Sequence, residues 1–114
     1  MKKIECIIRT EKLDELQEEL RLIGVGGLTA SEVKGFGCET TRPENYIFLP
    51  KTKIEIYAND ELVEEIINTF TRVCRTGQLG DGKFIVLPIE TAVRIRTGER
   101  DSRAQHRGPD KRRD

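Results

Sequence analysis

One arrangement of hydrophobic residues occurs twice in this chain, and the repeat constrains the fold more than any other feature. In each half, a segment of alternating apolar and polar residues precedes a segment with helical spacing, and a further strand-like segment follows. The opening of the second half, Lys53-Ile54-Glu55, repeats the Lys3-Ile4-Glu5 of the first. Each helical segment has a single apolar stripe, so each covers one layer. The pattern predicts an α+β domain with two helices on one face of an antiparallel sheet.

Local signals set the expected boundaries of these elements. Strands are predicted at residues 3–9, 28–33, 53–57 and 84–87. Thr10 is the expected N-cap of the first helix, and Gly24 ends that helix as a left-handed cap requires. Asn59 or Asp60 is expected to cap the second helix, whose apolar residues run from 62 to 74. This order of elements is the ferredoxin-like βαββαβ pattern.

Length and composition limit the classes of function. A chain of 114 residues forms one domain, and its 20 basic and 20 acidic residues cancel, which gives no electrostatic case for nucleic acid or membrane. Neither a membrane-spanning apolar stretch nor a signal peptide is present, so we expect a cytoplasmic protein. Beyond Thr97 the only apolar side chain is Ala104. We therefore expect a folded domain over residues 1–97 and a charged, disordered tail over 98–114.

The cysteines and the single histidine argue against a metal site or an active site. Cys6, Cys38 and Cys74 are odd in number, widely spaced and distant from histidine, which favours neither a disulfide framework nor a zinc site. Cys6 and Cys74 are predicted to be core residues, whereas Cys38 lies in a loop. His106 lies in the tail, so no nucleophile–base pair is evident. We expect a protein that is not an enzyme.

The glycine loop, residues 75–83, is the strongest candidate site. Its Gly77-x-x-x-x-Gly82-Lys83 fits the first seven positions of a P-loop. A P-loop, however, runs from strand to helix and has Ser or Thr after the lysine, whereas this loop runs from helix to strand and continues with Phe84. Glycines still allow a nest of N–H groups around a phosphate, and Lys83 adds a charge. The alternative is a helix-capping glycine at Gly77 followed by an ordinary turn.

Three motifs in this chain are specific when they occur together: Glu32-Val33-Lys34-Gly35-Phe36-Gly37, Thr76-Gly77-Gln78-Leu79-Gly80-Asp81-Gly82-Lys83 and Arg94-Ile95-Arg96-Thr97-Gly98-Glu99-Arg100. Four shorter segments support them: Lys2-Lys3-Ile4-Glu5, Lys12-Leu13-Asp14-Glu15, Phe48-Leu49-Pro50-Lys51 and Lys53-Ile54-Glu55-Ile56. In this order along the chain, they resemble the PII signal-transduction family, which comprises trimeric nucleotide sensors of bacteria, archaea and plastids.

The resemblance implies a homotrimer that holds ATP or ADP, with AMP as a further ligand to test, in clefts between subunits. The phosphates would contact the loop residues Gly80, Asp81, Gly82 and Lys83 and, from the neighbouring subunit, Arg94 and Arg96. Val93 and Ile95 alternate with these arginines, so an extended segment is expected to project both guanidinium groups from one face. The positions matching the adenosine site are Thr29, Gly35, Gly37, Glu55, Ile56 and Tyr57.

The chain departs from the family pattern in the loop that follows Gly37. That loop is several residues shorter than the usual T-loop, and Cys38-Glu39 stands where the family has Arg-Gln. Glu39 retains the ability to bind Mg²⁺ but would repel 2-oxoglutarate, a ligand of other family members. Lys51 matches the lysine that pairs with this oxo-acid, so a site for a small anion such as bicarbonate is expected there. Tyr46 does not align with the modified tyrosine of enteric members.

These observations favour a non-catalytic sensor that binds adenine nucleotide and controls an unidentified transporter or enzyme. Altered or absent 2-oxoglutarate sensing places it in a carbon-linked branch. The alternatives are a nitrogen-regulatory PII protein of the standard kind and a weak ATP-hydrolysing domain. A metal-binding trimer of related fold is disfavoured because clustered His and Cys ligands are missing.

Overall fold

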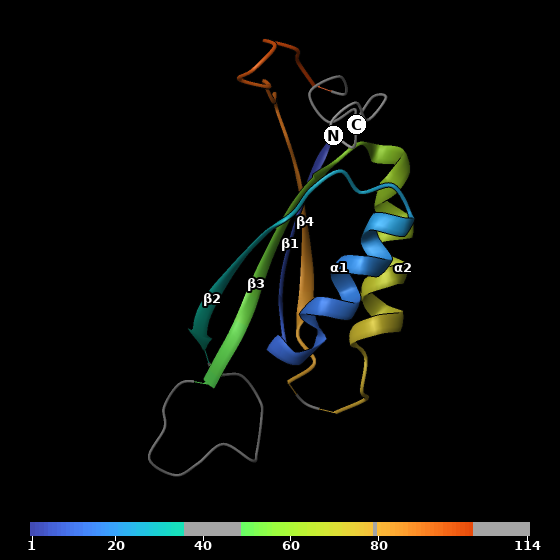
Figure 1. Ribbon diagram of the computed structural model, residues 1–114, viewed down its shortest axis with the longest axis vertical. Helices are drawn as coiled ribbons and strands as arrows, with labels where there is room; N and C mark the ends of the chain where they lie inside the picture. Colours follow the sequence, from blue (N-terminus) through green and yellow to red (C-terminus); the bar gives the residue numbers. More distant parts are fainter. Residues whose placement is uncertain (36–48, 79, 102–114) are drawn as a thin grey trace.

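The computed structural model describes residues 1–35, 49–78 and 80–101. Its elements are, in order, β1 Lys2–Ile8, the 3-10 turn η1 Thr10–Lys12, α1 Leu13–Leu22, β2 Thr29–Gly35, β3 Leu49–Ala58, the 3-10 turn η2 Asp60–Leu62, α2 Val63–Cys74 and β4 Lys83–Pro88. The strands form one antiparallel sheet in the order β2-β3-β1-β4. Both helices cover the same face of this sheet (Figure 1). The predicted ferredoxin-like α+β fold is confirmed.

The repeated Lys-Ile-Glu motif occupies the two central strands, and strand alternation explains it. Ile4 of β1 pairs with Ile56 of β3, and both side chains are buried beneath the helices. Glu5 pairs with Glu55, so both carboxylates lie on the face that carries no helix. Each half therefore supplies the same alternation to the centre of one sheet.

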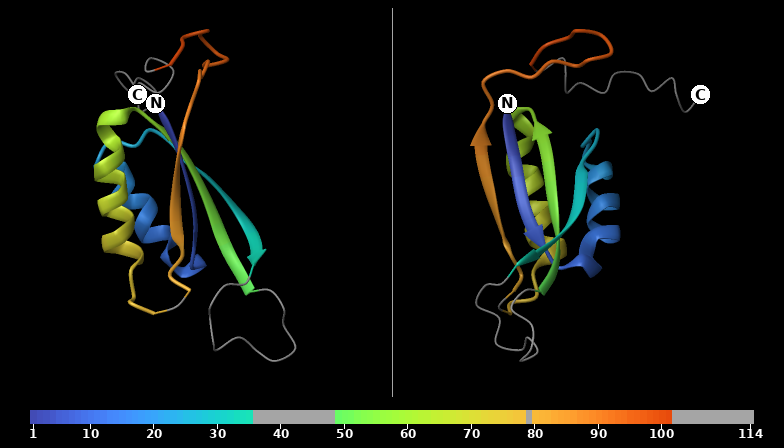
Figure 2. Two further views of the ribbon diagram at one scale, coloured as in Figure 1. Left: turned by 180° about the vertical axis from the view of Figure 1, so that it is seen from behind. Right: turned by 90° about the vertical axis from the view of Figure 1, so that its left-hand side faces the viewer.

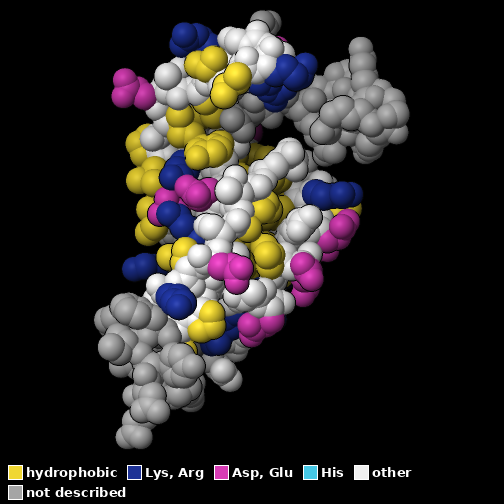
Figure 3. All heavy atoms as spheres, turned by 60° about the vertical axis from the view of Figure 1, so that its left-hand side comes forward, with side chains coloured by type: hydrophobic (Ala, Val, Ile, Leu, Met, Phe, Trp, Pro, Cys, Tyr) yellow, Lys and Arg dark blue, Asp and Glu magenta, His cyan; other side chains and the backbone are white. Residues whose placement is uncertain are grey.

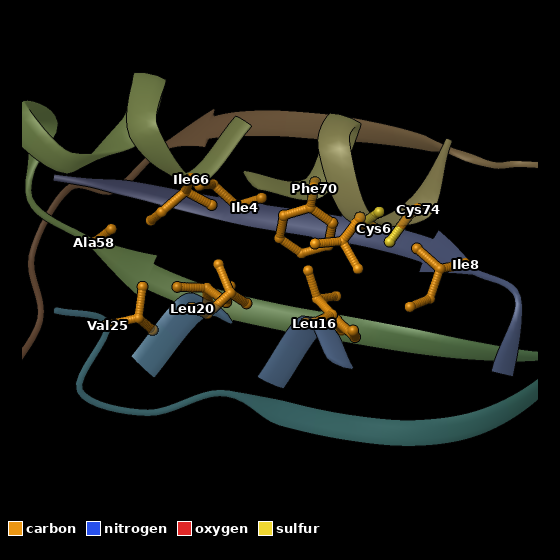
Figure 4. Close-up of a cluster of buried hydrophobic side chains, with 13 residues drawn as sticks. Ile4, Cys6, Ile8, Leu16, Leu20, Val25, Ala58, Ile66, Phe70 and Cys74 are labelled. Carbon is orange, nitrogen blue, oxygen red and sulfur yellow. The ribbon is translucent and has the colours of Figure 1, made fainter. Parts of the chain in front are cut away.

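The core lies between the sheet and the helices (Figure 4). Leu16 and Leu20 of α1 and Phe70 of α2 are fully buried against the strands, and the Phe70 ring packs edge-on against Phe84 at 5.1 Å between centroids. Cys6 and Cys74 lie in this core as free thiols, as predicted. Burial raises the pKa of the Cys6 thiol to about 12, which keeps it protonated and unreactive.

The beginnings of the two helices differ from the predicted caps. Thr10 opens η1, and its hydroxyl accepts a hydrogen bond from the Thr52 hydroxyl at 3.0 Å and does not cap the helix. Asn59 precedes η2 without a side-chain cap, and the Asp60 carboxylate pairs with the amino group of Met1 at 2.7 Å. Thr10 and Asp60 are therefore used in contacts with other parts of the chain, whereas the buried Asn59 Oδ1 has no hydrogen-bond partner among the described residues. Gly24 does end the first helix with φ of +101°.

The face of the sheet that carries no helix, called here the open face, combines ion pairs with exposed apolar side chains. The Lys3 ammonium lies 3.0 Å from the Glu55 carboxylate and 3.1 Å from that of Glu5, and these contacts raise the pKa of Lys3. Beside them lie four partly exposed apolar residues, Ile7, Tyr57, Ile85 and Leu87. Figure 3 shows hydrophobic side chains next to basic and acidic ones over this part of the molecule. The open face is thus not uniformly polar, and the described residues of one chain leave it exposed.

Candidate functional site

The glycine loop begins where α2 ends and returns the chain to β4. Its three glycines Gly77, Gly80 and Gly82 adopt φ values of +83°, +98° and +93°. This left-handed region is open to glycine and costly for other residues, which explains the composition of the loop. Gly77 lies two residues beyond the helix C-cap, Arg75, so the alternative in which it caps the helix is wrong.

Gly82 is required for a second reason, because the loop backbone touches β1 at this residue. A Cβ atom on Gly82 would lie 2.0 Å from the carbonyl oxygen of Ile7 and 3.1 Å from its carbonyl carbon. Both neighbouring atoms belong to the main chain of a central strand, so they cannot move aside as a flexible side chain could. The loop is therefore seated against the sheet at Gly82.

The Asp81 carboxylate is turned toward the loop itself. It accepts hydrogen bonds from the N–H groups of Thr76 and Gly77, each at 2.8 Å, and a short one from the Thr76 hydroxyl. The Arg9 guanidinium, at the end of β1, donates to the same carboxylate at 3.4 Å. These donors, the Thr76 hydroxyl foremost, hold the pKa of Asp81 well below its usual range. Sequence reasoning placed Asp81 in the phosphate cradle but did not identify Thr76 or Arg9 as its partners.

Lys51 connects the loop to the beginning of β3. Its ammonium donates to the carbonyl of Gly80 at 3.3 Å. The sequence predicted Lys51 as part of a second anion site together with Cys38 and Glu39, and those two residues lie outside the described part of the chain, as do Gly37 and Tyr46. For Lys51 the structure therefore adds a contact with the glycine loop and leaves the anion site a prediction.

Lys83 leaves the loop as the first residue of β4. It pairs in register with Ile7 and its side chain is exposed. Among the ion pairs of the described residues none involves Lys83. Its charge is therefore available to an anion that approaches the loop.

The predicted extended segment at Arg94 and Arg96 is a turn, so that expectation is wrong. Residues 92–101 form the arginine hairpin, in which the Arg94 N–H donates to the Glu99 carbonyl at 2.8 Å and the Gly98 N–H returns to the Arg94 carbonyl at 2.7 Å. Ile95 sits at its tip, 98% exposed. Gly98, with φ of +74°, permits the chain to reverse its direction tightly. The alternation of apolar residues and arginines did not indicate this turn. The two arginines lie on a turn and not on one face of a strand.

This hairpin includes both sides of the predicted domain boundary between 97 and 98. The Asp101 N–H donates to the Ala92 carbonyl at 2.8 Å, and the Asp101 carboxylate accepts from the Thr91 hydroxyl at 3.1 Å. Described residues 98–101 thus pair with residues that precede the boundary. The remainder of the predicted tail, 102–114, lies outside the described residues.

The glycine loop and the arginine hairpin lie at opposite ends of β4 (Figures 1 and 2). A six-residue strand is roughly 20 Å long, far beyond the reach of side chains toward one phosphate group. One chain therefore does not bring Lys83 together with Arg94 and Arg96. A site that contains all three charges requires two chains.

Apart from Gly37, which lies outside the described residues, the residues predicted around the adenosine lie on β2 and β3. Thr29 begins β2 and pairs with Glu55, whose carboxylate is held by Lys3, while Gly35 ends β2. Tyr57 is 46% exposed on the open face, whereas the Ile56 side chain is buried in the core. Ile56 can therefore offer a ligand only its main chain.

The comparisons with known proteins agree with these features. A family model described as nitrogen regulatory protein P-II matches residues 1–99. The chain belongs to the P-II family. It is 52% identical to the nitrogen regulatory protein P-II of Bradyrhizobium diazoefficiens over 106 residues, which cover 87% of this chain and 95% of that protein. It is also 49% identical to the Azospirillum brasilense protein of the same name, over 88% and 96% of the two chains.

A third relative, nitrogen regulatory protein P-II 1 of Escherichia coli K12, is 44% identical over 91% of this chain and 99% of its own. The family identifies the chain as a regulatory protein and not an enzyme. The relatives' names favour the nitrogen-regulatory alternative over the carbon-linked reading. Within the described ranges, no helix has the length and apolar character needed to cross a membrane, and no three metal-binding side chains gather.

Proposed function

We propose that this P-II family protein binds an adenine nucleotide in a cleft between two copies of the chain and thereby controls a partner protein. The observation that carries the proposal is the glycine loop, whose three glycines have left-handed φ values and whose Lys83 forms no ion pair with the residues that the structure describes. Such a loop presents N–H groups and one mobile cation, which suits a polyphosphate. The arginine hairpin at the far end of β4 would supply Arg94 and Arg96 from the second copy.

We further propose that the second copy belongs to a homotrimer in which the open faces of the sheets meet. Ile7, Tyr57 and Ile85 are each more than 40% exposed there, which is unusual for a cluster of large apolar residues on a lone domain. Burying them against another copy would remove this surface from water. The ion pairs that Lys3 forms with Glu5 and Glu55 would neutralise the charges enclosed with them.

The regulated process is proposed to be nitrogen control, as the names of the relatives suggest. Glu39 in place of glutamine is expected to weaken a response to 2-oxoglutarate, because two like charges at about 4 Å repel by about 1 kcal/mol in water and more in a cleft. Titrating 2-oxoglutarate into the Mg-ATP complex of the wild type and of Glu39→Gln tests this. Tighter binding by the variant supports the expectation, and tight binding by the wild type contradicts it. Bicarbonate is the second arm of the same titration.

The direct test of nucleotide binding is calorimetric titration with ATP, ADP and AMP, with and without Mg²⁺. The proposal predicts saturable binding at micromolar concentrations or below, with AMP the weakest because it has one phosphate for the loop. If ATP incubated with the protein for a long time is not converted to ADP, the protein is a sensor and not an ATP-hydrolysing domain. Failure of all three nucleotides to bind would overturn the proposed function.

A further inference from the structure

We infer that Asp81 is a positioning residue, which holds the glycine loop in its binding shape and does not contact the phosphates. The inference rests on the proposed nucleotide site and gives one of its residues a different role. Sequence reasoning counted Asp81 among the residues that cradle the phosphates. The structure instead connects its side chain, near the end of the loop, to Thr76 and Gly77 at the beginning of the loop and to Arg9 just after β1.

The Asp81 carboxylate already accepts hydrogen bonds from several donors of the same chain. Thr76 supplies its N–H and its hydroxyl, Gly77 its N–H, and Arg9 its guanidinium. A carboxylate offers about four lone-pair positions, so this set uses most of its accepting capacity. A carboxylate bound in this way is turned from solvent toward the loop, and its charge is offset by that of Arg9.

The contacts of the Asp81 carboxylate join the beginning of the glycine loop to its end. Thr76 and Gly77 are at its beginning, and Asp81 is near its end, between two glycines with positive φ. Glycine has more conformational freedom than any other residue, so a loop with three of them loses much entropy when it is ordered. Because the Asp81 side chain joins the two ends, the loop is already ordered in the free protein, and the ligand does not have to order it. Binding is then stronger than it would be to a loose loop.

Direct contact between the Asp81 carboxylate and a phosphate of the nucleotide is unfavourable. A carboxylate and a phosphate are both negative, and their close approach in a cleft is unfavourable unless a metal ion lies between them. A carboxylate that faced the phosphates would therefore weaken binding, and its removal would strengthen binding. A carboxylate that holds the loop has the opposite effect when it is removed. When Mg²⁺ is absent, the sign of the change in affinity therefore distinguishes the two roles.

The experiment measures ADP affinity without Mg²⁺ for Asp81→Asn, Thr76→Val and the double variant. We expect about tenfold weaker binding for Asp81→Asn, since Asn keeps the size but loses one charged acceptor. Thr76→Val removes the hydroxyl alone and is expected to cost a smaller factor. The double variant should bind about as well as Asp81→Asn, because both changes break one network. Thr71→Val is the matched control, since its hydroxyl bonds to the Ile67 carbonyl within α2.

A second readout follows the loop without a ligand. Amide hydrogen exchange at Thr76 and Gly77 should accelerate in Asp81→Asn, while exchange in β1 stays as in the wild type. This readout also identifies a variant that has lost its fold, because β1 would then exchange rapidly. In that case Thr76→Val, which leaves the carboxylate and both N–H donors in place, carries the test.

The outcomes separate this inference from the proposed function. If the wild type binds and Lys83→Ala weakens binding but Asp81→Asn does not, only the inference about Asp81 is wrong. Tighter binding by Asp81→Asn, with a larger gain for ATP than for AMP, would show that the carboxylate faces the phosphates. If the wild type binds no nucleotide, the proposed function fails, and faster exchange at Thr76 and Gly77 would still report on the loop.

Discussion

The two loops at the ends of β4 are built on a similar contact but are connected differently to the rest of the molecule. In the glycine loop the Asp81 carboxylate accepts from the hydroxyl and N–H of Thr76. In the arginine hairpin the Asp101 carboxylate accepts from the Thr91 hydroxyl at 3.1 Å and the Ala92 N–H at 3.3 Å. Both loops thus use an aspartate to join the two ends of a turn.

The difference lies in what else holds each loop. The glycine loop is fastened to β1 through Arg9 and through the close approach of Gly82 to Ile7, and to β3 through Lys51. The backbone hydrogen bonds that shape the arginine hairpin join its own residues, 92–101. The shape of the glycine loop therefore depends on contacts with β1 and β3, whereas the backbone hydrogen bonds of the hairpin, among the described residues, are local. Substitutions in the glycine loop should therefore lower the stability of the whole domain. Substitutions in the arginine hairpin should reduce ligand affinity more than stability.

The largest effect is expected from alanine at Gly82, compared with alanine at Gly98. Both glycines have positive φ, but a Cβ at Gly82 meets the Ile7 backbone, and one at Gly98 meets open space. We expect Gly82→Ala to lower the free energy of unfolding by about 2–5 kcal/mol and Gly98→Ala by about 1–2 kcal/mol. Urea denaturation measures both. Equal losses would show that the seating of the glycine loop on β1 contributes nothing.

The next effect concerns affinity and not stability. Removing one phosphate-binding cation, by Lys83→Ala in the glycine loop or Arg94→Ala in the hairpin, is expected to weaken ADP binding by about 1.5–3 kcal/mol, or ten- to a hundredfold. Titration calorimetry provides the affinity and a thermal melt the stability. Arg21→Ala, in the last turn of α1 and outside both loops, is the control that removes an exposed cation with little expected effect. Unchanged affinity in both variants would mean that the nucleotide binds elsewhere.

A smaller effect is expected when the hairpin's aspartate is changed. Asp101 accepts fewer hydrogen bonds than Asp81, and both are longer than those that Asp81 accepts from Thr76 and Gly77. At φ of +55° asparagine is well tolerated. Asp101→Asn should therefore weaken ADP binding less than Asp81→Asn does and leave the free energy of unfolding within about 1 kcal/mol of the wild type. The same denaturation and titration series compares the two variants. A larger loss of ADP affinity or stability in Asp101→Asn than in Asp81→Asn would contradict this prediction.

The smallest effect is a pH dependence of stability. The pKa of Asp81 is lower in the folded protein than in the unfolded chain, so its contribution is complete above the unfolded value of about 3.9 and is lost as pH falls further. Between pH 5 and pH 3 the wild type should lose stability more steeply than Asp81→Asn. Unfolding experiments at a series of pH values give the two slopes. Parallel curves would show that the Asp81 hydrogen bonds do not stabilise the loop.

Patterns that depend on near neighbours in sequence predicted the fold well. Alternation and helical spacing identified the sheet and both helices, and the glycine run correctly marked a loop with left-handed residues. The edges of β2 and β3 were less predictable because they depend on pairing with each other, which extends β2 to Gly35 and starts β3 at Leu49. Such pairing is not encoded in either segment alone.

Contacts between distant residues could not be predicted from the sequence. Arg9 and Asp81 are 72 positions apart, and only the antiparallel arrangement of the strands brings them together. Thr10 looked like a cap because nothing nearby reveals Thr52 as a partner for its hydroxyl. In the arginine hairpin, the alternating pattern suggested a strand, whereas Gly98 and the contact between Thr97 and Glu99 favour a turn. In the hairpin, the turn-forming residues prevail over the alternating pattern.

The central claim is that a complete site needs the glycine loop of one chain and the arginine hairpin of another. Mixing Lys83→Ala with Arg94→Ala tests it directly, at an ADP concentration that fills only intact sites. After subunits have been exchanged by unfolding and refolding together, mixed oligomers would contain some sites with both Lys83 and Arg94. The account predicts that such mixtures regain part of the wild-type binding that neither variant shows alone. Mixed oligomers, verified by two different affinity tags, that bind no more ADP than the separate variants would contradict it.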